Sequence, residues 1–184
     1  MEGEGGERTS YRLGEGHVPS ANTELARLEA QVVGSWEREA ELFVRHGLRP
    51  DADVVEAGCG PGFVTERLLD LVPNGSVTAF DLDPRMVELA SARVAGRARV
   101  GVARGSVTDT GLQDASADAV IARLVLQHVP NVDAALAELR RLLRAGGRLI
   151  VLDVDDGATL LVDPAPAFLR PLLEGFGEIG RAHV

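Results

Sequence analysis

The 184-residue chain contains no lysine, because all 19 of its basic residues are arginines. A Schiff-base lysine, a phosphate-binding Walker lysine and a lysine general base are therefore excluded. There is one cysteine, Cys59, so neither an intrachain disulfide nor a zinc site built on a cysteine pair is available. Positive charge is also scarce, since 28 acidic residues give a net charge of −9. This balance argues against a nucleic-acid groove, which needs clustered positive charge.

Aromatic residues and long apolar runs are scarce as well. Aromatic residues make up 4% of the chain and apolar residues 45%, so we expect a core of aliphatic side chains. No apolar run approaches the roughly 18–20 residues that span a bilayer. The first residues are acidic and glycine-rich, whereas a signal peptide begins basic and continues apolar. We therefore expect a cytoplasmic protein that binds neither a membrane nor nucleic acid.

The apolar pattern predicts the fold class. Between residues 22 and 46, apolar side chains recur at steps of three and four, which predicts an amphipathic helix. Further along, short apolar runs alternate with helical patterns. Strands are predicted at 53–57, 76–80, 99–103, 117–122 and 148–154, and helices at 63–72, 84–95 and 131–144. This alternation predicts an α/β fold: a Rossmann-like, doubly wound, mostly parallel sheet of about five strands with an N-terminal helical arm.

The most informative segment is VVEAGCGPG, residues 54–62, where a strand runs into three alternating glycines and then a helix. Glycine permits both the tight turn and the close approach of a ligand to the backbone. Asp81 stands at the end of the second predicted strand, where an acid binds ribose hydroxyls in open α/β sheets. Phe63 occupies the position at which the dinucleotide fingerprint requires its third glycine, which weighs against NAD or FAD.

Three segments in order resemble the class I S-adenosylmethionine (SAM) dependent methyltransferases. VVEAGCGPG resembles the first motif of that family, and FDLDPRMV resembles its acidic turn after the second strand. Residues 117–155 resemble its fourth strand through its fifth strand. The likeness covers roughly residues 50–155 and implies SAM as cofactor and S-adenosylhomocysteine (SAH) as product. It is nearest in character to bacterial methyltransferases of small molecules, which implies a small-molecule acceptor.

The resemblance also implies roles for residues of the first two motifs. The residues that would cradle the methionine and ribose parts of SAM are Gly58, Gly60 and Gly62. Glu56 would orient the turn or reach the amino group of the cofactor. Asp81 would take both ribose hydroxyls, and Leu82 would pack on the adenine.

Beyond the third strand the match is less regular. The family often has an acid there that binds the adenine amino group, whereas this chain has Ser106 in its place, followed by Val107. Arg123 follows the fourth strand, beside the methionine end. Either its guanidinium pairs with the SAM carboxylate or only its backbone carbonyl is used. His128 is the candidate general base, and the alternative is a structural or solvated histidine. Alignment and exclusion of water provide much of the rate of methyl transfer, so no metal site is expected.

We expect residues 1–47 to form a tail and helical lid, and residues 48–184 to form the SAM-binding domain. After Asp153 no pattern corresponds to the sixth and seventh strands of the family, so either the domain is truncated at its C-terminus or a partner covers the fifth strand. The fifth strand would then present a bare edge that favours self-association. Two functions remain open: an active methyltransferase of a small molecule, or a SAM-binding but inactive module that acts through partner contacts. A nucleotide-sugar or NAD enzyme is a weaker third hypothesis.

Overall fold

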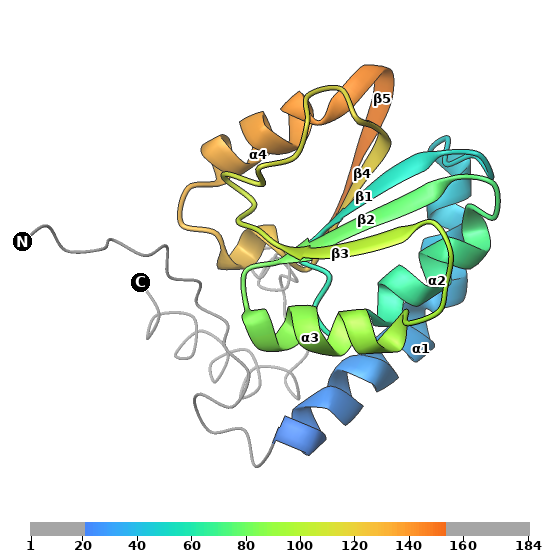
Figure 1. The fold of residues 1–184 in the computed structure, drawn as a ribbon, viewed down its shortest axis with the longest axis vertical. Coiled ribbons are helices and arrows are strands. Elements are labelled where there is room, and N and C mark those ends of the chain that lie inside the picture. The colour runs from blue at the N-terminus through green and yellow to red at the C-terminus, as the bar shows by residue number, and fades with distance from the viewer. Residues whose placement is uncertain (1–20, 154–184) are drawn as a thin grey trace, which may run out of the picture. The chain divides into compact units, whose positions relative to one another are not determined.

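The computed structural model describes residues 21–153, so the predicted tail before residue 21 and the segment after Asp153 lie outside the described residues. Five strands form one sheet in the order β3-β2-β1-β4-β5, and every neighbouring pair is parallel (Figure 1). The strands are β1 Asp53–Ala57, β2 Ser76–Asp81, β3 Val100–Arg104, β4 Ala117–Arg123 and β5 Leu143–Leu152. This arrangement confirms the Rossmann-like, doubly wound sheet that the sequence predicts.

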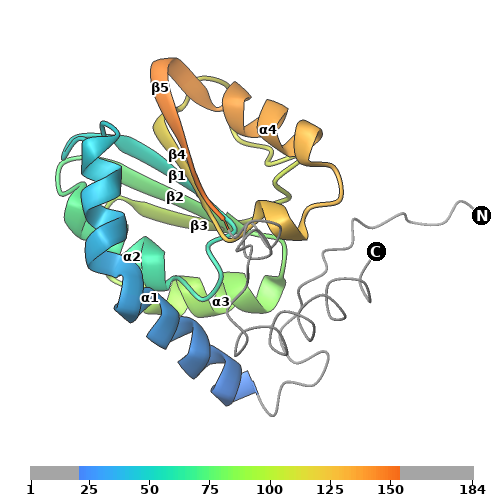
Figure 2. The same ribbon diagram turned by 180° about the vertical axis from the view of Figure 1, so that it is seen from behind.

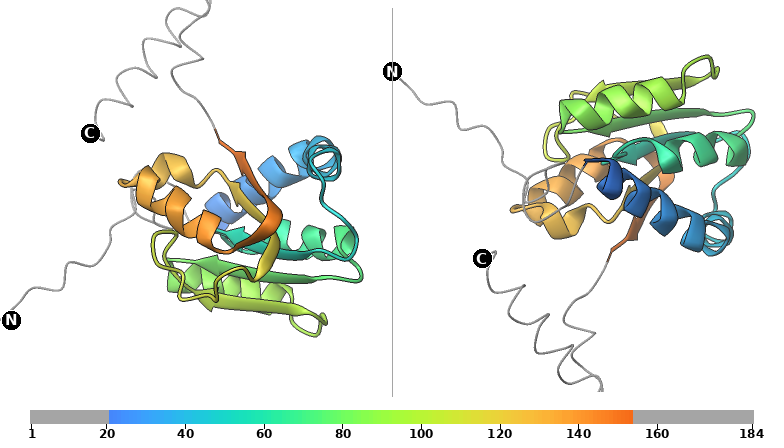
Figure 3. Two further views of the ribbon diagram at one scale, coloured as in Figure 1. Left: turned by 90° about the horizontal axis from the view of Figure 1, so that it is seen from above. Right: turned by 90° about the horizontal axis from the view of Figure 1, so that it is seen from below.

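Helices cover both faces of this sheet (Figures 1 and 2). The helices are α1 Ala21–Arg45, α2 Phe63–Leu71, α3 Pro84–Arg93 and α4 Val132–Arg141, with a short 3₁₀ helix, Leu126–His128. Figure 3 shows α1, α2 and α3 on one side of the sheet and α4 on the other. Because all strands run in the same direction, their carboxyl ends meet at one edge, which is where ligands bind in open α/β sheets.

Within the described residues, two large clusters of mainly aliphatic side chains form most of the core, one on each face of the sheet, and a smaller cluster holds Cys59, Ala79 and Ala90. On the first face, Phe43 of α1 and Leu68 of α2 are fully buried against Ile121 of β4. On the second face, Leu139 of α4 is fully buried against Val120 of β4. Side chains of β1 and β4 contribute to both clusters, so these two strands are buried on both faces, as is typical of a parallel sheet covered by helices.

The boundary between α4 and β5 differs from the prediction. The helical pattern predicted a helix to residue 144 and a strand from 148, whereas α4 ends at Arg141 and β5 begins at Leu143. The cause is tertiary: Leu143 pairs with Ala117 across the sheet, and the register then shifts before the pairing continues. Gly146 has φ +80, a left-handed conformation that glycine adopts without steric cost. The prediction of this boundary was wrong because the spacing of apolar residues alone does not reveal the irregular pairing between β4 and β5.

A charged cluster fastens the β3–β4 connection to α4. Glu138 of α4 accepts hydrogen bonds from the backbone N–H of Thr110 at 2.8 Å and from its hydroxyl at 2.6 Å. The Arg141 guanidinium donates to both Glu138 oxygens at 2.7 Å. Arg141 and Thr110 hold the pKa of the Glu138 carboxyl at about 2, below its ordinary value. The cluster therefore fixes the segment that carries Ser106 and Val107.

Replacing Glu138 by Gln should lower the free energy of unfolding at neutral pH by about 1–2 kcal/mol, since hydrogen bonds to a charged group are lost. The folded pKa lies below the unfolded value of about 4.5, so the stabilisation is present above that pH and is lost as the pH falls toward 2. Urea unfolding of the wild type and Glu138→Gln should therefore differ by a constant amount above about pH 5 and converge near pH 2. A difference that persists unchanged at pH 2 would contradict this account.

Candidate cofactor and active site

The glycine turn lies at the carboxyl edge of the sheet, between β1 and α2, and its glycines are Gly58, Gly60 and Gly62 with φ of +65, +53 and +81. These left-handed values favour glycine at all three positions. Hydrogen bonds fix the turn: the N–H of Cys59 donates to the carbonyl of Phe80 at 3.0 Å, and the N–H of Gly62 donates to the carbonyl of Cys59 at 3.1 Å. The turn is thus tied to the end of β2.

Each glycine meets a different environment. A Cβ at Gly58 would lie 2.5 Å from Cγ2 of Val125, and one at Gly62 would lie 2.9 Å from the Cα of Ala90 in α3. A Cβ at Gly60 would meet nothing within 4 Å. Two glycines therefore permit close packing within the protein, whereas Gly60 faces open space in which a ligand can approach the backbone.

Asp81 connects the turn to the end of β2. One oxygen of its carboxylate accepts the N–H of Gly60 at 2.8 Å, and the other accepts the N–H of Asp83 at 2.9 Å. Burial raises the pKa of Asp81, and these two backbone hydrogen bonds oppose that rise. The sequence placed Asp81 at this edge, and the structure brings it to the glycine turn.

Glu56 lies beneath the turn with only 3% of its surface exposed. Its Oε2 atom and the hydroxyl of Thr65 in α2 are both buried without a hydrogen-bond partner. Burial, reinforced by the negative charge of Asp81, raises the pKa of Glu56 to about 8, while the Thr65 hydroxyl, which lies close to the carboxyl without a well-formed hydrogen bond, and the positive charge of Arg123 oppose the rise. A buried carboxyl with an unpaired oxygen is costly unless a ligand uses it, so Glu56 makes this edge a candidate functional site.

Cys59 is buried in the turn, and its Sγ lies 3.6 Å from the carbonyl of Gly60. Burial raises the pKa of its thiol, and the carboxyls of Glu56 and Asp81 raise it further. Because the thiolate is the nucleophile, this environment disfavours cysteine chemistry. Cys59 therefore acts as a small side chain that fills the turn.

The Arg123 guanidinium points to α1. Its Nε lies 3.0 and 2.8 Å from the two carboxylate oxygens of Glu39, and Nη2 donates to the hydroxyl of Ser35 at 3.2 Å. The side chains of Arg123 and Glu39 are 12% and 14% exposed, so the pair is largely desolvated. Of the two roles expected for Arg123, pairing with a ligand carboxylate would have to compete with Glu39. Use of its backbone carbonyl leaves the ion pair intact.

Three other expected residues surround the same edge. Leu82 follows β2 directly, is partly exposed, and its carbonyl accepts from Nε of Arg104 at 3.2 Å. The Ser106 hydroxyl is 2.9 Å from that of Thr108 and also accepts the Thr108 N–H at 3.1 Å. Val107 packs against the core cluster on the α4 face. The hydroxyl of Ser106 is therefore turned into its own loop.

His128 ends the 3₁₀ helix that follows β4, and it is partly exposed. The residue after β4, Leu124, has φ +55, and its N–H donates to the carbonyl of Leu152 at 2.7 Å. A left-handed non-glycine residue is uncommon and is often found at functional sites. No sequence pattern indicated this strained junction or the 3₁₀ helix, and both place His128 near the carboxyl edge.

The α1 helix packs against the sheet through an aromatic pair. Trp36 and Phe43 form an edge-to-face contact with ring centroids 6.1 Å apart, and both belong to the core cluster on that face. Trp36 is therefore a partly buried side chain that packs against the core. Its neighbour Ser35 and, one turn later, Glu39 meet Arg123, so the same helix contacts the carboxyl end of β4.

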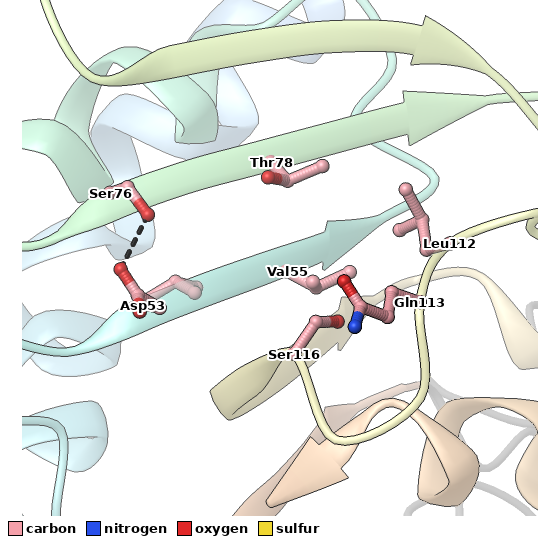
Figure 4. A pocket seen from close by; sticks show the side chains of 8 residues that line it. Asp53, Val55, Ser76, Thr78, Leu112, Gln113 and Ser116 are labelled. Carbon is pink, nitrogen blue, oxygen red and sulfur yellow. Dashed lines mark hydrogen bonds between the residues drawn. The ribbon is translucent and has the colours of Figure 1, made fainter.

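A separate hollow of about 270 Å³ lies over the sheet at the opposite, amino-terminal half of β1 and β2 (Figure 4). Its lining includes Asp53, Ser76, Thr78 and Gln113, and the Ser76 hydroxyl donates to Asp53 at 2.6 Å. Because Asp53 also pairs with Arg144 at 2.9 Å, its charge is satisfied by the protein.

Within residues 21–153 there is no cluster of metal-ligating side chains, and no helix is long and apolar enough to cross a membrane.

Comparison with known proteins identifies this arrangement. Residues 55–151, more than half of the chain, match a family model described as a methyltransferase domain. The chain belongs to the class I SAM-dependent methyltransferase family. The match begins within β1 and ends within β5, so it includes the glycine turn, Asp81 and the junction after β4.

Relatives of the family share this domain within longer proteins. A 37.1 kDa protein in transposon TN4556 of Streptomyces fradiae is 35% identical over 149 residues, 80% of this chain and 43% of that protein. The malonyl-[acyl-carrier protein] O-methyltransferase of Hahella chejuensis is 36% identical over 98 residues, 53% of this chain and 35% of that protein. The chain thus spans less than half the length of these two relatives.

A solved structure shows the same fold. The crystal structure of a SAM-dependent methyltransferase from Aquifex aeolicus matches with a TM-score of 0.60 and 24% identity, over 63% of each chain. At the glycine turn, the residues of this chain fit the cofactor that the family name implies. The open space at Gly60 admits a ligand to the backbone, and the unpaired oxygen of buried Glu56 suits a positively charged group.

Proposed function

We propose that this chain binds SAM at the glycine turn and transfers its methyl group to a small-molecule acceptor. The observation that carries the proposal is the set of groups at one edge: open space at Gly60, the Asp81 carboxylate beside it, and the unpaired Glu56 oxygen beneath. Names of relatives support the acceptor class, since they include methyltransferases of malonyl-[acyl-carrier protein] and of demethylmenaquinone. The net charge of −9 also favours an acceptor other than nucleic acid.

In this proposal each residue at the carboxyl edge of the sheet has a separate role. The glycine turn, with Gly58, Gly60 and Gly62, would accommodate the methionine and ribose parts, and Asp81 would bind the ribose hydroxyls. Glu56 would face the amino group, and Leu82 the adenine. Ser106 and Val107 would border the adenine, although the hydroxyl of Ser106 would first have to leave Thr108. Arg123 would contribute its backbone carbonyl while its side chain holds α1.

Methyl transfer requires the protein to align the reactants rather than to form covalent bonds with them. SAM supplies a methyl group already activated by its sulfonium. The chain would hold acceptor and cofactor in line and exclude water, with the α1 arm as a lid near Arg123. His128 would take the proton of an acceptor that must lose one. We further propose a cytoplasmic protein whose edge strand β5 supports self-association, since β5 ends the sheet in the described part of the chain.

An inactive SAM-binding module is the second candidate, since the groups at the carboxyl edge account for cofactor binding without themselves requiring methyl transfer. Transfer of labelled methyl from SAM to an acidic and a neutral metabolite fraction separates the two functions. The enzyme predicts label in a small molecule, with loss of transfer in Asp81→Ala. Binding of SAH without any transfer would establish the module instead, and absence of SAH binding would remove both.

Binding of SAH should release a proton near pH 7, because Glu56 is protonated in the free protein and would ionise beside the amino group of the ligand. Its folded pKa of about 8 lies above the ordinary value of 4.5, so affinity should rise with pH up to about 8. Calorimetry in two buffers of different ionisation enthalpy measures the released proton. Glu56→Gln should bind without proton release. Asp51→Asn, which changes an exposed acid paired with Arg49, should behave as the wild type.

A further inference from the structure

The outer side of the glycine turn is in contact with α3 at two points. Ala90 lies against Gly62, where an added Cβ would come within 2.9 Å of its Cα. One turn further along α3, Nε of Arg93 donates a hydrogen bond to the carbonyl of Pro61 at 3.0 Å. Arg93 is the last residue of α3, so the C-terminal end of this helix contacts the turn.

The same guanidinium makes two more contacts. Its carbon lies 3.9 Å from the centroid of the Phe63 ring, a cation–π geometry. Its Nη1 lies 3.6 Å from Oε2 of Glu66 in the first turn of α2. Arg93 therefore contacts the residues on both sides of Gly62, the N-cap of α2, which has no side chain of its own to cap the helix.

The chemistry of this contact requires arginine. A planar guanidinium can donate in its plane to a carbonyl while its face covers an aromatic ring, which an ammonium group cannot do in the same way. The Arg93 side chain is 30% exposed, so the contact is partly shielded from water. It also explains Phe63: the residue that departs from the dinucleotide fingerprint provides the ring on which Arg93 rests.

We propose that Arg93 is a positioning residue, which holds the Pro61–Phe63 segment so that the backbone of Gly60 and the open space beside it stay in place for the cofactor. This inference rests on the proposed SAM-binding function. Arg93 does not itself touch the ligand. It acts through the backbone of Pro61 and the ring of Phe63.

The test uses Arg93→Met, which keeps an apolar stem over Phe63 but removes the hydrogen bond and the charge. We expect its Kd for SAH to rise about tenfold, and Arg93→Lys to recover part of that loss. In the free protein, hydrogen exchange of the Gly60 and Gly62 amides should accelerate, since both are held by hydrogen bonds of the turn.

Arg97→Met is the matched control. Arg97 follows α3 and pairs with Asp70 of α2 at 2.6 Å, so this variant also removes an ion pair between the same two regions. Its SAH affinity and its exchange at Gly60 should match the wild type. If Arg93→Met keeps wild-type SAH affinity and wild-type exchange, or if Arg97→Met shows the same losses, the positioning role is overturned. Failure of the wild type to bind SAH would instead overturn the proposed function.

Discussion

Asp81→Ala should raise the Kd for SAH at least about 100-fold, equivalent to about 3 kcal/mol. The variant removes the proposed acceptor for the ribose hydroxyls and also releases the N–H of Gly60, which Asp81 accepts at 2.8 Å. Both losses affect the same ligand, and hydrogen bonds to a charged group are the stronger kind. Calorimetric titration of the purified variant with SAH measures the effect directly.

Asp83→Ala provides the control for Asp81. Asp83 lies two residues away and caps α3, where its carboxylate accepts the N–H of Arg85 at 2.8 Å. Loss of this cap should cost about 1 kcal/mol of stability while the Kd for SAH stays within about twofold. If both variants weaken SAH binding equally, Asp81 acts only through the local backbone, and its assignment to the ribose is wrong.

Gly60→Ala and Gly62→Ala should separate ligand binding from stability. A Cβ at Gly62 would press on the backbone of Ala90 at 2.9 Å, so α2 and α3 must move apart. We expect the free energy of unfolding of Gly62→Ala to fall by about 2–4 kcal/mol. A Cβ at Gly60 meets no protein atom within 4 Å, and its left-handed backbone should cost only about 1–2 kcal/mol.

For SAH affinity we expect the opposite ranking, with Gly60→Ala more damaging than Gly62→Ala. The methyl group of Gly60→Ala would enter the space proposed for the cofactor, so its Kd for SAH should rise about 100-fold despite its milder loss of stability. Urea unfolding and SAH titration of both variants measure the two effects independently. Wild-type affinity in Gly60→Ala would show that the open space beside Gly60 is not the ligand site.

The sequence predicted the parts of the fold that depend on local patterns. The first strand was predicted at 53–57 and is observed at Asp53–Ala57, because a buried apolar run and a glycine turn define its ends. Asp83 stands directly before Pro84 and caps the next helix, where its carboxylate accepts the N–H of Arg85. The start of β5 was predicted five residues too late, since the pairing of Leu143 with Ala117 depends on a neighbouring strand.

The placement of the candidate-site residues in the glycine turn and at the end of β2 was predictable, because it follows from the strand–turn–helix order. Side-chain pairs between residues far apart in the sequence could not be predicted. The pairing of Arg123 with Glu39 joins residues 84 positions apart, and no sequence pattern indicates it. Arg93 was likewise missed, because its contact with Pro61 depends on how α3 packs. Arg93 and Arg97 lie four residues apart in the sequence, as do their partners Glu66 and Asp70. This matched spacing could have indicated that the two segments pack side by side, but not the hydrogen bond from Arg93 to the turn.

The most direct test of SAM binding at the glycine turn is an NMR titration of the isotope-labelled chain with SAH. The account predicts that the amide resonances of Gly58, Gly60 and Gly62 shift first and saturate together, and that the same shifts in Asp81→Ala require at least about 100-fold more SAH. It also predicts no change around the hollow that Asp53 and Gln113 line. Resonances that remain fixed at the turn, or that move only around that hollow, would contradict the account.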